Sequence, residues 1–147
     1  MTKIIREWRL RFMTFLKWVW TFPQSFLGLI ILLITGATKN WVRYKSHWYR
    51  FYIAKRFRGT WGVSLGEFVI FGSVPQFTSN CHEIGHQKQS LILGWFYLLI
   101  IGVPSFCGNV FDRLFHRRWP MLKRIDWYYS QPWEHWADVL GGVIRAK

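Results

Sequence analysis

The chain of 147 residues carries a net charge of +13, and 51% of its residues are hydrophobic and 20% aromatic. Its length suits one domain, its aromatic content excludes a disordered chain, and its two cysteines exclude a disulfide scaffold or a four-cysteine zinc ribbon. Many large apolar side chains beside many cations leave two classes of protein, a nucleic-acid binder and a membrane-associated protein.

Residues 1–20 are predicted to form a basic amphipathic helix that lies on an anionic membrane surface. Cations lie mainly off the apolar stripe, whose members recur at spacings of three and four: Ile4, Trp8, Phe12, Phe15 and Val19. The segment does not resemble a cleavable signal peptide, because its apolar part comes late and no small-residue cleavage site follows.

Two charge-free segments follow, residues 18–38 and residues 89–111. A helix needs about 20 apolar residues to cross the hydrocarbon core, so residues 18–38 are predicted to be a transmembrane or membrane-inserted helix. The strongest part of the second segment, residues 91–103, is shorter and stops before Pro104. We therefore predict a re-entrant or interfacial segment with its bend at Gly102 and Pro104. For both segments the alternative is a core helix of a soluble protein.

Cations and aromatic residues alternate over residues 39–58, which contain no acid. Such a mixture can bind single-stranded nucleic acid, but beside an apolar segment it favours contact with lipid headgroups. No specific nucleic-acid partner is expected. Residues 48–54 and 61–71 are rich in β-branched and aromatic residues. Residues 58–60 lie between them and include a glycine, which suits a turn. These segments predict a small β-hairpin.

Residues 82–86 read HEIGH, which is the HExxH pattern. His82 and His86 are four residues apart and fall on one face of a helix, so that both imidazoles can reach one metal ion. Glu83 lies between them, where it can take a proton from a metal-bound water. The alternative is a solvated helix face with two unrelated histidines.

A third metal ligand is predicted from the few acids in this basic chain. Glu134 is the best candidate, and Asp138, four residues later on the same helical face, would accept the free ring N–H of a ligand histidine. His135 is the rival ligand, because it lies about 100° from Glu134 around the helix and only one of them can face the site. Alternatively, the two acids only solubilise a short helix.

HExxH followed by Glu134-x-x-Ala137-Asp138 resembles the gluzincin metallopeptidases, most closely the membrane-embedded HtpX and CAAX prenyl protease group. It is also similar to small bacterial membrane proteins with the same motif layout. The resemblance implies that His82, His86 and Glu134 bind zinc, that Glu83 is the general base and that Asp138 supports a ligand. HtpX-type enzymes have more membrane helices and a larger catalytic domain, so the resemblance does not extend to the substrate.

Zincins of this kind pair extended substrates with an edge strand beside the metal. In this chain the candidates for that strand are Ser64, Leu65, Gly66 and Glu67. The alternative is a small sheet that only packs under the metal-binding helix.

The sequence thus predicts an α+β membrane protein, mainly helical, with a small β-hairpin beside a zincin-like HExxH helix. Residues 39–147 would form the catalytic region of a zinc-dependent metallopeptidase that acts on a peptide or membrane-protein substrate in the lipid bilayer. The basic segments predict that its active site lies on the cytoplasmic side, and the resemblance to bacterial membrane proteins implies a bacterial inner membrane. Oligomerisation stays open. The alternatives are a non-catalytic membrane protein with structural zinc and a basic membrane-surface adaptor.

Overall fold

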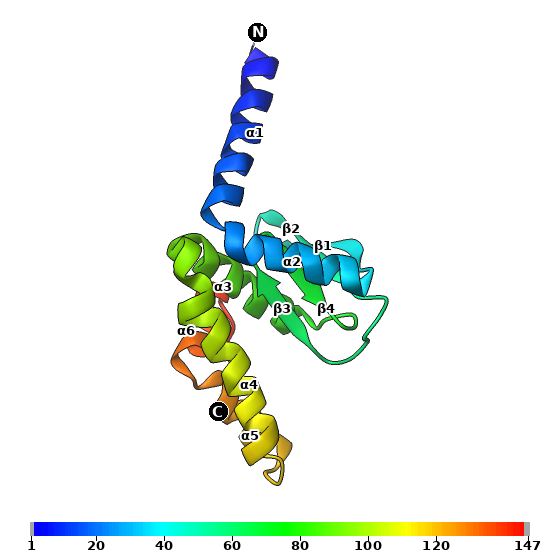
Figure 1. The fold of residues 1–147 in the computed structure, drawn as a ribbon, viewed down its shortest axis with the longest axis vertical. Helices are drawn as coiled ribbons and strands as arrows, with labels where there is room; N and C mark the ends of the chain where they lie inside the picture. The colour runs from blue at the N-terminus through cyan, green and yellow to red at the C-terminus, as the bar shows by residue number, and fades with distance from the viewer. Residues whose placement is uncertain (1, 146–147) are drawn as a thin grey trace.

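The computed structural model describes residues 2–145, without the side chains of residues 2–6, 9, 10 and 48. The helices and strands are α1 (Thr2–Trp20), α2 (Phe22–Thr35), β1 (Thr38–Tyr44), β2 (His47–Ile53), β3 (Gly62–Leu65), β4 (Phe68–Phe71), α3 (Phe77–Leu93), η1 (Gly94–Phe96), η2 (Leu98–Gly102), α4 (Val103–Phe115), α5 (Met121–Tyr129) and α6 (Pro132–Gly141) (Figure 1). The predicted α+β class, mainly helical, is confirmed.

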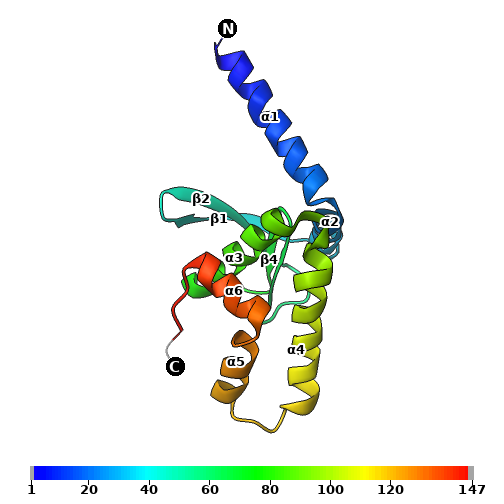
Figure 2. The ribbon, with the colours of Figure 1, turned by 90° about the vertical axis from the view of Figure 1, so that its left-hand side faces the viewer.

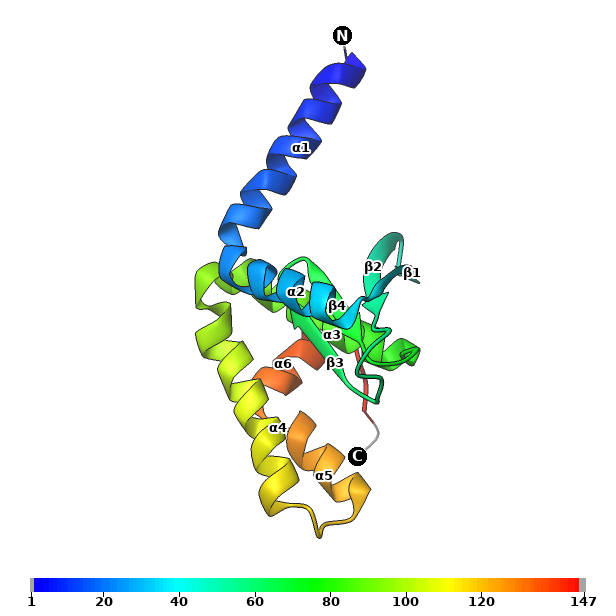
Figure 3. The same cartoon turned by 45° about the vertical axis from the view of Figure 1, so that its right-hand side comes forward.

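The body of the protein has three layers, with the sheet between α2 on one side and α3 and α6 on the other (Figure 2). Helix α1 projects away from this body, whereas α4 and α5 extend from the opposite end (Figure 3). Ile70 of β4 and Ala137 of α6 are fully buried, and Ile84 of α3 is nearly so. The core therefore sits around α3, the helix that carries the HExxH residues.

The sheet has four strands in the order β1-β2-β4-β3. Strands β1 and β2 form one antiparallel hairpin and β3 and β4 another, while β2 and β4 pair in parallel. The predicted hairpin between residues 48–54 and 61–71 is therefore wrong, because residues 61–71 themselves fold back at Gly66. That residue has a φ of 59°, and a Cβ there would overlap Ser25 Oγ of α2. A glycine is required both by the turn and by the approach of the helix.

The first charge-free segment does not form one helix from residue 18 to residue 38. Helix α1 ends at Trp20, α2 begins at Phe22, and their axes differ by 95°. Pro23 lacks the N–H that would reach the carbonyl of Val19, and the indole of Trp95 donates to that carbonyl instead, at 2.8 Å. At 14 residues, α2 is about 21 Å long, which is less than the hydrocarbon core of a bilayer.

The second charge-free segment turns at Gly94 and not at Gly102 and Pro104, so the predicted position of the bend is wrong. Gly94 has a φ of 53°, and the ring of Trp20 packs where its Cβ would be. From Leu98 the chain continues as a helix through a π-helical turn, which accommodates Pro104 without a sharp bend. Helix α5 then runs back beside α4 and returns the chain to α3 (Figure 2).

Two helices expose apolar stripes. The segment Leu98–Phe115 is long and apolar enough to cross a membrane, and 17% of it is buried. The segments Arg11–Trp20 and Phe22–Thr35 reach that length and hydropathy only when they are taken together as one bent span. The exposed stripe of the first segment consists of Leu99, Val103, Phe106, Val110 and Leu114. On α1, Trp8, Phe12, Phe15 and Val19 are exposed, and the side chain of Ile4 lies outside the described residues. Within the described part of the chain, no other segment packs over either stripe.

Helices α3 and α6 pack backbone against backbone at Gly85, where a Cβ would overlap the carbonyl of Ala137. We expect Gly85→Ala to destabilise the fold by roughly 1–3 kcal/mol, because it pushes these two helices apart. Gly108→Ala on α4 is the matched control: its Cβ would meet its nearest atom at 3.7 Å, and helix propensity favours alanine. Thermal unfolding in detergent measures both variants. Equal melting temperatures would show that α3 and α6 do not pack this closely.

Candidate metal centre

Three buried side chains from two helices converge on one point. His82 and His86 of α3 face Glu134 of α6. The two Nε2 atoms are 3.1 Å apart, and Oε2 of Glu134 lies 3.1 Å from Nε2 of His82 and 3.3 Å from Nε2 of His86. The structure thus brings together the three residues predicted as metal ligands. His86 and Glu134 are 48 positions apart in the chain.

Both imidazoles are held in one orientation by their other nitrogen. Nδ1 of His82 donates to Oδ1 of Asp138 at 2.7 Å, and Nδ1 of His86 donates to Oε1 of Gln89 at 2.7 Å. Because these acceptors carry no proton, Nδ1 of each ring is the protonated nitrogen, and each Nε2 directs its lone pair into the cluster. Asp138 therefore lies where the sequence predicted it.

Gln89 was missed by the sequence analysis, which treated it as the start of an apolar segment. It is fully buried, and its Nε2 donates to the carbonyl of Trp133 at 2.8 Å. One amide thus fixes the ring of His86 and ties α3 to the start of α6. The available signal was its spacing, because a residue three positions after His86 lies on the same helical face.

Arg145 is the second residue that the sequence analysis missed. Its Nε lies 2.5 Å from Oδ2 of Asp138, and its Nη2 lies 3.0 Å from Oδ1. Its guanidinium stacks 3.3 Å from the ring centroid of Tyr129, and the rings of Tyr129 and His82 pack perpendicular to each other. Gly142, with a φ of 66°, turns the chain back so that Arg145 reaches this position, and sequence spacing gave no signal for it.

His135, the rival ligand, is exposed on the outer face of α6. Glu134 and Asp138 occupy the inner face, and Glu134 has no exposed surface. The offset of one residue along α6 therefore turns His135 away from the cluster. Glu134, and not His135, faces the two histidines.

The cluster fits a small divalent cation. Zinc held by nitrogen and oxygen at about 2.0–2.1 Å in a tetrahedron has ligand atoms about 3.3 Å apart. The three ligand atoms here are 3.1 to 3.3 Å apart. Two lone pairs and a carboxylate oxygen pointing at each other repel unless a cation or a proton lies between them. The second oxygen of Glu134, Oε1, is buried and has no hydrogen-bond partner within the described part of the chain.

A proton can take the same place as a metal ion. Burial opposes a charge on His82, but its hydrogen bonds to Asp138 and Glu134 outweigh burial and raise the pKa of this imidazole to about 9. Burial likewise opposes the charge on Glu134, but hydrogen bonds from His82 and His86 outweigh it and lower the pKa of the carboxyl. Protons and metal ions are therefore expected to compete for these atoms.

This competition predicts a pH dependence with a defined sign. The folded pKa of His82 is raised from 6.5 to about 9, so in metal-free protein its stabilising contribution is complete below pH 6.5 and is lost as the pH rises through about 9. Zinc affinity should change in the opposite direction, increasing up to tenfold per pH unit between about pH 6.5 and 9. Thermal unfolding of metal-free protein from pH 6 to pH 9 measures the first effect. If His82→Ala shows the same decrease, another group is responsible.

Glu83 is the acid nearest to the cluster that takes no part in it. Its side chain is buried, and its Oε2 has no hydrogen-bond partner in the described structure. Its Oε1 lies 2.8 Å from the position that a Cβ on Gly62 would take. Burial raises the pKa of this carboxyl, while the charges of His86 and His82 lower it. A carboxylate whose pKa is moved toward neutrality is suited to take up and release a proton.

The predicted substrate strand is only partly at an edge. Strand β3 is the outer strand of the sheet, but Ser64 and Leu65 are buried, and the hydroxyl of Tyr97 donates to the carbonyl of Ser64 at 2.8 Å. Gly66 and Glu67 form the turn to β4 and are not in a strand. At the beginning of the strand, Gly62 is exposed and lies beside Glu83. The pairing of a substrate with this strand stays a prediction.

No protein-family model, no curated protein and no solved structure matches the chain.

Proposed function

We propose that the chain is a membrane-associated zinc metallopeptidase of the gluzincin type. The observation that carries this proposal is the convergence of two imidazole nitrogens and one carboxylate oxygen, 3.1 to 3.3 Å apart, beside a buried carboxylate with an unpaired oxygen. This arrangement has the composition of a catalytic zinc site, with three protein ligands and a neighbouring acid–base group.

His82, His86 and Glu134 would hold the metal, and their two nitrogens and one oxygen are donors that suit zinc. Zinc in this position supplies a Lewis acid for a carbonyl oxygen and lowers the pKa of water. Asp138 and Gln89 keep the two imidazoles in the required orientation and tautomer. Glu83 would accept a proton at its unpaired Oε2 and return it to the amine that leaves.

A structural zinc site is less well supported by the donor set. Structural sites usually have four protein ligands and are rich in cysteine, whereas catalytic sites keep one position open. Cys81 precedes His82 in the chain, but its side chain packs with Tyr44 and Ile84 in an apolar cluster. The described group of possible ligands comprises His82, His86 and Glu134. An unpaired buried Glu83 oxygen also serves no purpose in a site that is only structural.

An extended peptide is the substrate form that the fold suits. Strand β3 is at the edge of the sheet, and its exposed Gly62 lies against the carboxylate of Glu83. A peptide added to this edge would place its backbone next to the acid–base group. A side chain at residue 62 would collide with Oε1 of Glu83 and with the ring of Phe71, so glycine is what allows this close approach.

Association with a lipid bilayer is supported by the exposed stripes of α1 and of Leu98–Phe115. Uncovered apolar surface of this extent is a typical interaction site, and lipid tails cover it without shape complementarity. The net charge of +13 adds attraction to anionic lipids. The cytoplasmic side of a bacterial inner membrane is the location we propose on these grounds.

Washed membranes test both parts of the proposal together. Membranes that contain the chain should retain it after a high-salt wash, because salt screens charge but leaves apolar contacts intact. They should cleave an unfolded protein substrate, and a chelator should stop the cleavage without releasing the chain. Complete release by salt would support a membrane-surface adaptor instead, and cleavage that resists chelation would contradict a metallopeptidase.

A further inference from the structure

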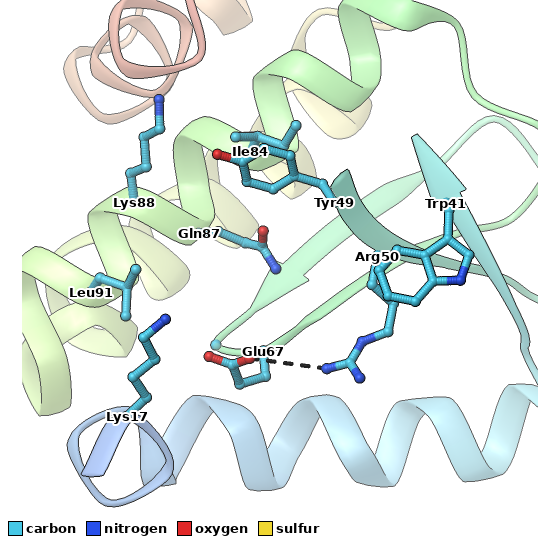
Figure 4. Close-up of a pocket in the computed structure, with 10 residues that line it drawn as sticks. Lys17, Trp41, Tyr49, Arg50, Glu67, Ile84, Gln87, Lys88 and Leu91 are labelled. Atoms are coloured by element: carbon cyan, nitrogen blue, oxygen red, sulfur yellow. Dashed lines mark ion pairs between the residues drawn. The ribbon is translucent and has the colours of Figure 1, made fainter. Parts of the chain in front are cut away.

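A cavity lies on the opposite face of α3 from the candidate metal centre. It has a volume of about 390 Å³ and is enclosed by α3, the β1–β2 hairpin, the turn between β3 and β4, and the last turn of α1 (Figure 4). Its α3 lining includes Gln87 and Leu91, which are roughly half a turn around the helix from His82 and His86. The cavity therefore has no residue in common with the metal centre.

Cations outnumber acids around this cavity. The ammonium of Lys17 and the amide of Gln87 point into the space, and the guanidinium of Arg50 extends toward Glu67 from the side (Figure 4). Glu67 is the one acid in the lining. Lys88 also lines the cavity, but its Nζ donates to the carbonyl of Leu140 at 2.6 Å. Lys17, Arg50 and Gln87 therefore remain as donors for a ligand.

The interactions of Arg50 are incomplete. Its Nη2 is 4.0 Å from Oε2 of Glu67, and the two side chains are 37% and 26% exposed, so this ion pair contributes little. Its Nε is buried and has no hydrogen-bond partner among the described residues. A weakly paired guanidinium beside a cationic cavity suits an anion that accepts two hydrogen bonds, and phosphate is such an anion.

We propose that this cavity binds the phosphate of an anionic phospholipid headgroup. Arg50 and Lys17 would bind the phosphate oxygens, and Gln87 would donate to the headgroup. The apolar part of the lipid has its own surface, because Trp41 and Leu91 line the cavity and are 53% and 41% exposed. The cavity also adjoins the last turn of α1, a helix that exposes apolar side chains along its length. A soluble phosphate would leave Trp41 and Leu91 uncovered.

Calorimetric titration of the purified full chain in neutral detergent tests this proposal. The probes are dioctanoyl phosphatidylglycerol, dioctanoyl phosphatidylcholine and inorganic phosphate. We expect saturable binding of phosphatidylglycerol, one per chain, and binding at least tenfold weaker for the other two probes. Inorganic phosphate that binds as tightly as phosphatidylglycerol would overturn the assignment to a lipid.

Variants separate the cavity from the general positive charge of the chain. Arg50→Gln should weaken phosphatidylglycerol binding about tenfold or more, since hydrogen bonds to charged groups are among the strong ones. Lys17→Gln should weaken it several-fold, and Glu67→Gln should strengthen it, because a competing acceptor is removed. Arg58→Gln, an exposed cation outside the cavity, is the matched control and should have no effect.

Equal losses in Arg50→Gln and Arg58→Gln, or weaker binding in Glu67→Gln, would overturn the proposal. Thermal unfolding of each variant checks its fold. If Arg50→Gln does not fold, the opposite effects expected of Lys17→Gln and Glu67→Gln still decide the question.

Discussion

Glu83→Gln is expected to reduce peptide hydrolysis by about 10²- to 10⁴-fold and to leave the zinc content unchanged. Glutamine has nearly the same volume as glutamate but cannot accept and return the proton. Glu83 is not among the atoms that converge at the metal centre, so its replacement leaves all three ligands in place. Cleavage of an unfolded protein and metal analysis of the same preparation give the two readouts.

Glu7→Gln on α1 is the matched control, because Glu7 is exposed and remote in sequence from the site. It should cleave at the rate of the parent. If Glu83→Gln also cleaves at that rate, Glu83 is not the base. If Glu83→Gln instead loses its zinc and unfolds, the residue has a structural role against Gly62 of β3.

The second large effect is expected from the ligands. His82→Ala, His86→Ala and Glu134→Ala should each lower the bound zinc to roughly a tenth of the parent's or less after dialysis, because each removes one of three ligands. Replacement of Asp138 or Gln89, which only orient the imidazoles, should weaken zinc binding about 10- to 100-fold. Metal analysis against protein concentration measures the series.

His135→Ala serves as the control for these variants, since His135 neighbours Glu134 but is exposed. It should retain full zinc. Full zinc in Glu134→Ala together with loss in His135→Ala would show that α6 is rotated by about one residue relative to the structure described here.

The cluster of His82, His86 and Glu134 was largely predictable because its determinants are local. Two histidines four residues apart define a helical face, and the acids are so few that Glu134 and Asp138 stood out. The choice between Glu134 and His135 was not predictable, because it depends on how α6 is rotated against α3. Gln89 and Arg145 were missed for a related reason, since their partners are set by packing between helices and by the turn at Gly142.

The fold class was predictable from the sequence, but the pairing of the strands and the breaks between the helices were not. Apolar, β-branched residues indicated strands, but only the approach of α2 to Gly66 explains why residues 61–71 fold back on themselves. The charge-free segments were found from composition, whereas the positions at which the helices break within them were not. Those breaks depend on long-range contacts, namely the indole of Trp95 on the carbonyl of Val19 and the ring of Trp20 against Gly94.

X-ray absorption at the zinc edge of the purified chain tests the central claim most directly. We expect one bound zinc with nitrogen and oxygen ligands at about 2.0–2.1 Å, a scattering contribution from two imidazoles, and no sulfur. His86→Ala should remove the zinc or one of the two imidazole contributions. A sulfur ligand at about 2.3 Å, which would come from Cys81, Cys107 or another sulfur donor, or a preparation that binds no zinc, would contradict the proposed centre.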